Sequence, residues 1–151
     1  MLFRGKLQRA QDAVKRALSD LGPEDRFNVV TFSGSATRLS AQLLAPTREN
    51  LLRAFAFVDG MTLSPATNFS AGVRSVFSLA AVTHVFLLSD GEPTEGTRDY
   101  AQLRAEIRQL NTTGARVLTL ALGLGEQFPG IRLLQGIAED SGGQFSYVNL
   151  R

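Results

Sequence analysis

Apolar residues follow two different spacings along the chain, and the two kinds of segment alternate. In five segments the apolar residues recur every three or four positions with charged residues between them, a pattern typical of amphipathic helices. These predicted helices lie at residues 6–21, 47–59, 69–80, 100–110 and 131–141. Between them are short runs rich in β-branched and aromatic residues, which predict strands at residues 27–32, 38–44, 84–89, 116–123 and 144–148.

The run from Val85 to Leu88 is apolar without interruption, which is typical of a strand buried on both faces of a parallel sheet. The segment at 38–44 alternates only weakly and predicts an edge strand joined to its predecessor by a short hairpin. Strands and helices alternate over the whole length, which favours a doubly wound α/β fold with a mostly parallel sheet and helices on both faces. With 151 residues and no internal repeat or linker, the chain fits a single domain.

Asp90 follows the strand at 84–89, where the chain leaves the sheet. In open α/β sheets, ligands bind outside the carboxyl ends of the strands, so a carboxylate here can be a metal or ligand group. The Asp90-Gly91 pair also suits a tight turn with no function in binding. The local sequence leaves both readings open.

Composition narrows the classes of function. Hydrophobic residues make up 44% and charged residues 20% of the chain, as in ordinary globular proteins. The net charge is only +2, with 16 basic residues scattered among 14 acidic ones, so a nucleic-acid partner is not expected. There is no cysteine, which excludes disulfides and thiolate chemistry. No apolar run reaches the roughly 20 residues that span a bilayer, and the first residues lack the apolar region of a signal peptide. We expect a soluble chain, and its compartment is not determined.

Three segments of the sequence resemble a von Willebrand factor type A domain, and most of all the A domains of inter-alpha-trypsin inhibitor heavy chains and their bacterial relatives. They are Gly22 to Ser33, Ala66 to Val73 and Leu87 to Thr94, and the resemblance extends from about residue 5 to residue 148. It implies a doubly wound sheet with an antiparallel edge strand. It also implies a metal-ion-dependent adhesion site that binds a protein partner.

In that family an Asp-x-Ser-x-Ser motif, a Thr and a second Asp hold Mg²⁺, or Mn²⁺ or Ca²⁺, at the carboxyl ends of the strands. Thr67 matches the Thr and Asp90 matches the second Asp. The open coordination position takes a carboxylate from the partner. Oxygen ligands suit a hard divalent cation, which also keeps several waters.

The Asp-x-Ser-x-Ser motif, which should precede the first helix, is not found. Residues 1–7 match only the family segment between that motif and the first helix, and residues 31–35 (TFSGS) have Thr where Asp is needed, so we interpret them as a decoy. We therefore expect an N-terminally incomplete domain without its first strand, which belongs between the strands at 27–32 and 84–89. The gap could be closed by direct pairing, by a segment of a second chain through self-association, or by a strand of a longer natural protein. With Thr67 and Asp90 alone, we expect weak or no metal binding.

The resemblance favours a protein-binding module, and the residues give little support to an enzyme. The alternative within the same family is a regulatory subunit or domain of a chelatase or AAA+ ATPase complex. A hydrolase or phosphatase is a weaker prediction, since nucleotide-binding motifs are missing and His84, the only histidine, begins its strand at the end opposite Asp90. Glu92 could pair with Asp90 in acid–base chemistry, but an exposed loop glutamate is usually only solvated.

Overall fold

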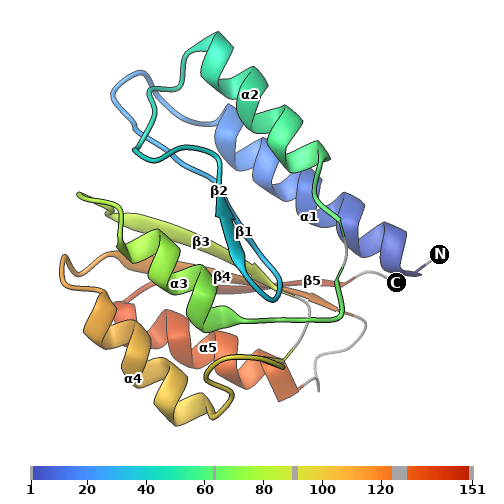
Figure 1. The fold of residues 1–151 in the computed structure, drawn as a ribbon, viewed down its shortest axis with the longest axis vertical. Helices are drawn as coiled ribbons and strands as arrows, with labels where there is room; N and C mark the ends of the chain where they lie inside the picture. Colours follow the sequence, from blue (N-terminus) through green and yellow to red (C-terminus); the bar gives the residue numbers. More distant parts are fainter. Residues whose placement is uncertain (1, 63, 90–91, 124–128, 150–151) are drawn as a thin grey trace.

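The computed structural model describes residues 2–62, 64–89, 92–123 and 129–149. Within these ranges the chain forms five helices and five strands that alternate as the sequence predicts (Figure 1). The helices are α1 (Leu2–Ser19), α2 (Arg48–Asp59), α3 (Phe69–Phe77), α4 (Tyr100–Leu110) and α5 (Pro129–Ser141). The strands are β1 (Val30–Phe32), β2 (Ala36–Arg38), β3 (His84–Ser89), β4 (Arg116–Gly123) and β5 (Phe145–Asn149).

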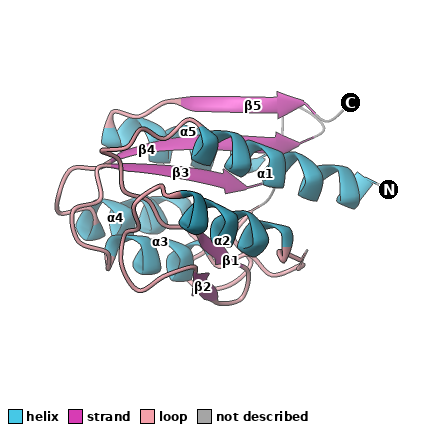
Figure 2. Ribbon diagram, turned by 90° about the horizontal axis from the view of Figure 1, so that it is seen from above, coloured by secondary structure: helices cyan, strands magenta, loops and turns pink. Residues whose placement is uncertain are grey.

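The strands lie in one layer between two layers of helices. β3, β4 and β5 form a parallel sheet in that order, in which Val85 is paired with Val117. β1 and β2 form a separate antiparallel pair, with Thr31 opposite Thr37. Helices α1 and α2 lie on one side of the strands, and α3, α4 and α5 lie on the other (Figures 1 and 2). The predicted α/β fold, with helices on both faces and an antiparallel edge, is confirmed.

Helix α3 packs against both sheets. Phe69 of α3 is fully buried, its ring centroid lies 5.4 Å from that of Phe32 on β1, and it shares an apolar cluster with Leu87 on β3. Gly72 allows this packing, because a Cβ at that position would lie 2.9 Å from the ring of Phe32. Within the described residues, no backbone hydrogen bond joins β1 to β3. Direct pairing of these two strands is therefore not what closes the predicted gap.

The two faces of β3 differ in burial. Alternate side chains of a strand point to opposite faces. Leu87 is buried against α3, α4 and α5, whereas Phe86 is 62% exposed and His84 is also exposed. The prediction that this strand is buried on both faces is wrong for the face that carries Phe86. On that face α1 contacts the parallel sheet at β4, while α2 packs on α1 and around Phe27 instead.

The first strand is shorter than its sequence predicts. β1 begins at Val30, because the side chain of Asn28 replaces the regular ladder just before it. Asn28 Oδ1 accepts a hydrogen bond from the Ser40 N–H at 3.2 Å, and Asn28 Nδ2 donates to the Ser40 carbonyl oxygen at 2.8 Å. The predicted bounds of the second strand, 38–44, are wrong: β2 covers Ala36–Arg38 and shares only Arg38 with that range, although a bridge between Phe27 and Leu44 continues the pairing.

The first helix begins earlier than expected. Residues 2–7, which the family resemblance places between an adhesion motif and the first helix, are part of α1. They contain no proline, and Leu, Arg and Lys are good helix formers that offset Gly5. Across the described residues, no helix is both long enough and apolar enough to cross a membrane.

Candidate functional site

Three loops meet beyond the carboxyl ends of β1 and β3. They are residues 33–35 between β1 and β2, residues 64–68 before α3, and residues 92–97 after β3, and we call this set the carboxyl-edge corner. Asn68 joins the first two loops. Its N–H donates to the Ser33 carbonyl oxygen at 2.8 Å, and its Nδ2 donates to the Gly34 carbonyl oxygen at 3.2 Å. Asn68 Oδ1 also accepts from the Ala71 N–H at 3.0 Å and so caps α3.

Thr67 is fixed through its backbone to the loop after β3. Its N–H donates to Thr94 Oγ1 at 2.8 Å. Its carbonyl oxygen accepts from the N–H groups of Thr94 at 2.8 Å and Glu95 at 3.2 Å. Because these bonds satisfy both backbone groups of Thr67, the loop before α3 and the loop after β3 are positioned as a pair. Both loops lie beyond the carboxyl ends of the strands, where open α/β folds bind ligands.

Two glycines allow the loops to approach so closely. Gly96 has a φ of +68°, in the left-handed region, and a Cβ there would overlap Asn68 Oδ1. At Gly34, a Cβ would lie 3.0 Å from Glu95 Oε2. The carboxylate of Glu95 therefore lies beside the turn at 33–35 and places a negative charge at the corner.

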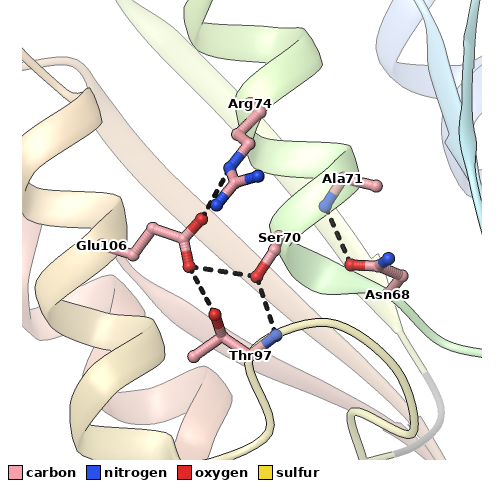
Figure 3. A network of polar contacts seen from close by, with 6 residues as sticks. All are labelled: Asn68, Ser70, Ala71, Arg74, Thr97 and Glu106. Carbon is pink, nitrogen blue, oxygen red and sulfur yellow. Dashed lines mark hydrogen bonds and ion pairs between the residues drawn. The ribbon is translucent and has the colours of Figure 1, made fainter.

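Glu106 of α4 connects the corner to the packed helices (Figure 3). Its Oε2 accepts hydrogen bonds from Ser70 Oγ at 3.0 Å and from Thr97 Oγ1 at 2.9 Å, and its Oε1 accepts from Arg74 Nε at 2.9 Å. Ser70 Oγ in turn accepts from the Thr97 N–H at 3.2 Å. Burial raises the pKa of the Glu106 carboxyl. The hydrogen bonds from Thr97 and Ser70 and the charge of Arg74 outweigh this, so its pKa lies below the usual 4.5.

A second contact holds the far end of the same loop. Tyr100, the first residue of α4, donates from its hydroxyl to Glu92 Oε1 at 3.0 Å. Burial, this hydrogen bond and the negative charge of Glu92 together raise the pKa of Tyr100 to about 12. The phenol is therefore neutral at physiological pH and acts as a hydrogen-bond donor to the loop.

The residues predicted from sequence have different outcomes. Thr67 lies in the corner, joined to the loop after β3. Asp90 lies outside the described residues, and whether it shares a site with Thr67 stays a prediction. Among the described residues that flank this gap, Ser89 ends β3 and Thr94 contacts Thr67. His84 begins β3 and is exposed at the opposite edge, where its Nδ1 lies 3.0 Å from Thr83 Oγ1.

Sequence reasoning missed several residues that build the corner. Asn68 carried a usable signal, because Asn immediately before an apolar helical pattern is typical of a helix N-cap. Thr94 and Gly96 lie in a loop that sequence patterns describe only as polar. Glu106 occupies the polar side of an amphipathic helix, where nothing in the sequence indicates that its partners come from α3 and the loop after β3.

The described residues do not provide a metal site by themselves. Among them, no group of three or more His, Asp or Glu residues is placed to hold an ion. Thr67 supplies one hydroxyl, and Glu95 is the carboxylate beside the turn. Divalent cations such as Mg²⁺ take six or more oxygen ligands, several of them often waters.

The fold is that of a doubly wound α/β domain, in which three loops meet beyond the carboxyl ends of β1 and β3. A family model, the von Willebrand factor type A domain, matches residues 3–147. The chain belongs to this family.

Curated relatives include inter-alpha-trypsin inhibitor heavy chain 4 of Mus musculus, which is 27% identical over 150 residues covering 91% of this chain. Heavy chain H1 of Homo sapiens is 30% identical over 132 residues covering 80% of this chain. The chain spans 16% of the first relative and 14% of the second. The predicted resemblance to these proteins is confirmed.

Solved structures share the fold. A von Willebrand factor type A protein from Catenulispora acidiphila superposes with a TM-score of 0.77 at 21% identity, covering 97% of this chain and 35% of that one. Proximal thread matrix protein 1 from the mussel byssus was solved with zinc in its MIDAS motif, the metal-ion-dependent adhesion site. It superposes with a TM-score of 0.63 at 21% identity, covering 95% of this chain and 36% of that one. A metal-occupied site therefore exists in a protein of similar fold.

Proposed function

We propose that this chain is a non-catalytic protein-binding module that engages its partner through the carboxyl-edge corner. The observation that carries the proposal is the pairing of Thr67 with Thr94 and Glu95, which fixes two loops side by side at the ligand-binding edge of the sheet. Family membership supports it, since von Willebrand factor type A domains are typically interaction modules. Binding residues on loops held by a rigid scaffold are a common arrangement in proteins.

The proposal includes an acidic side chain as the partner group. Glu95 places a negative charge at the corner, so a carboxylate of the partner would be repelled unless a cation lies between them. In the family site that cation is held by residues that Thr67 and Asp90 match. One hydroxyl and one carboxylate are too few ligands for an ion that keeps its waters tightly. We therefore propose that this chain by itself binds Mg²⁺ or Mn²⁺ weakly or not at all.

The edges of two strands suggest a second mode of association. Among the described strands, β1 pairs only with β2 and β3 pairs only with β4, so the other edge of each is not paired by a described strand. We propose that an extended segment occupies the position between β1 and β3, and that in the isolated chain these edges promote self-association. Unpaired strand edges are templates for pairing with another chain. The exposed ring of Phe86 on β3 adds apolar surface beside that edge.

A peptide library displayed on phage provides ligands with which to test the corner. Peptides are selected on the immobilised chain with Mg²⁺ and again with a chelator, and the affinities of selected peptides are measured for three variants. Thr94→Val removes the Oγ1 that accepts from the Thr67 N–H, and Thr67→Ala removes the side-chain hydroxyl that the family resemblance assigns to the site. Thr113→Val is the matched control for Thr94→Val, because both threonines are exposed and the Oγ1 of each makes one backbone hydrogen bond. That of Thr113 donates to the Val82 carbonyl oxygen at 2.9 Å, before β4 at the opposite end of the strands.

The proposal predicts that Thr67→Ala and Thr94→Val weaken peptide binding by about tenfold or more, the range expected for loss of a well-placed hydrogen bond at an interface. Thr113→Val should leave the affinity unchanged. Peptides rich in Asp or Glu should be scarce in both selections, because this chain by itself binds the bridging ion weakly or not at all. Peptides that bind both corner variants as well as the original chain, or that lose binding with Thr113→Val, would contradict the proposal.

A further inference from the structure

We propose that Glu106 is the positioning residue of the carboxyl-edge corner: its carboxylate fixes the loop after β3 onto the first turn of α3. The inference rests on the proposed function, because the corner is the surface whose geometry Glu106 would control. Glu106 itself lies on α4 and belongs to none of the three loops of the corner.

Two successive residue pairs, which we call rungs, join the segment at 67–70 to the loop after β3. In the first rung, Thr67 pairs with Thr94 through backbone groups and the Thr94 hydroxyl. In the second, Ser70 pairs with Thr97, since Ser70 Oγ accepts from the Thr97 N–H. Each residue of the second rung lies three positions after its counterpart in the first. Because the two pairs are only three residues apart on the same segments, we expect a displacement of Ser70 and Thr97 to move Thr67 and Thr94 as well.

Glu106 closes the second rung. Its Oε2 accepts from both hydroxyls of that rung, Ser70 Oγ and Thr97 Oγ1, so that three elements meet at one oxygen atom (Figure 3). The Glu106 side chain is only 17% exposed, and Ser70 is buried. A buried hydroxyl left without its acceptor is costly.

The partners of Glu106 indicate that its acceptor oxygen matters more than its charge. Arg74, the cation of the cluster, has a side chain that is 66% exposed, and exposed ion pairs contribute little. The two hydroxyls need only an acceptor. A glutamine at this position keeps a carbonyl oxygen for Ser70 and Thr97, whereas an alanine removes it.

A control for this role lies on the neighbouring helix. Asp140 of α5 is 16% exposed, nearly the same as Glu106, and its carboxylate binds Arg104 at 2.7 Å and Arg108 at 2.9 Å, both on α4. Within the described residues, these contacts join α4 to α5 and none of them reaches the corner. If Glu106 only held helices together, loss of Asp140 would have the same effect on the loop as loss of Glu106.

The test is amide hydrogen exchange measured by NMR on the full chain. In Glu106→Ala, the amides of Thr94 and Thr97 should exchange at least about tenfold faster, while amides of β4 keep their rates. Glu106→Gln should stay within about threefold of the original chain. Asp140→Ala should leave both loop amides unchanged. If Glu106→Ala does not fold, Ser70→Ala removes one hydroxyl from Oε2 and the acceptor of the Thr97 N–H, and it should accelerate the same two amides.

Three results would overturn the inference: unchanged loop amides in Glu106→Ala, equal acceleration in Asp140→Ala, or equal acceleration in β4. The binding experiment remains separate. If the loop amides respond as expected but selected peptides bind Glu106→Ala as tightly as the original chain, the positioning role stands and the corner is not the binding surface.

Discussion

The two sides of the strand layer differ in how completely helices cover them. The well-covered side contains the larger apolar cluster, and the other side leaves part of β3 exposed. On the side of α3, α4 and α5, one continuous apolar cluster includes the fully buried Phe69, Leu103 and Ile137. On the side of α1 and α2, a smaller cluster forms around Ala54 and Val58, and Phe86 of β3 remains largely exposed.

The corner is built from the packed side. Asn68, Ser70 and Arg74 come from α3 or its N-cap, and Glu106 comes from α4, so the loops of the corner are attached to the rigid part of the molecule. The open side exposes Phe86 on β3, and β3 is also a strand with one edge that no described strand pairs. The proposed binding at the corner therefore depends on the packed side, and the proposed strand addition or self-association depends on the unpaired edge of β3.

The largest expected effect tests whether the α3 side carries the stability. Phe69 is fully buried, lies against Phe32 of β1 and shares an apolar cluster with Leu87 of β3. Phe69→Ala should lower the free energy of unfolding by about 3–5 kcal/mol, because it removes a large ring and leaves a cavity. Urea denaturation followed by circular dichroism measures this change. A loss below about 1 kcal/mol would mean that α3 does not join the two sheets as the packing indicates.

Acid should destabilise the same side. The pKa of Glu106 lies below 4.5, because its hydrogen bonds and the charge of Arg74 outweigh the effect of burial. The hydrogen bond from Arg104 lowers the pKa of Asp140, burial opposes this, and the charges of Arg104 and Arg108 add to the lowering, so that its pKa lies below 3.8. A carboxyl with a depressed folded pKa stabilises the fold above its unfolded value, and this stability is lost as pH falls through the folded value.

The free energy of unfolding should therefore decrease as the pH falls below 4.5, and further below 3.8. The double variant Glu106→Gln/Asp140→Asn should show a flatter pH dependence in urea denaturation at a series of pH values. An equally steep decrease in the double variant would show that other carboxyls control acid unfolding.

The smallest expected effect on stability concerns the open side. Phe86→Ser should change the free energy of unfolding by no more than about 0.5 kcal/mol, because the ring is 62% exposed. The same variant should shift the chain toward the monomer in light scattering at high concentration. If the original chain is already a monomer at every concentration, the proposed self-association is wrong.

The sequence predicts the order and the type of the elements because their apolar spacings are regular. β3 and β4 have the predicted bounds, since each is a short apolar run between turn residues. β1 is shorter because the Asn28 side chain competes with the ladder, a local interaction that a strand pattern does not show. The exposure of Phe86 depends on which helices reach β3, and an apolar run alone cannot distinguish one covered face from two.

The candidate site could be predicted only in part. The resemblance identified Thr67, and its position at the carboxyl edge is a consequence of the fold. The residues that fix it in place come from distant segments: Thr94 lies 27 positions away and Glu106 acts through Ser70, 36 positions away. Such pairings depend on the tertiary structure, and a single sequence carries no periodic signal for them.

The most direct test of the account is to map where a selected peptide contacts the chain. Amide chemical shifts are followed by NMR while a peptide selected on the original chain is added. We expect the largest shift changes at Ser35, Thr67, Thr94 and Gly96, in the three loops of the corner. Changes concentrated at Thr113 and Gly114 before β4, at the opposite edge of the sheet, would contradict the assignment of the corner as the binding surface.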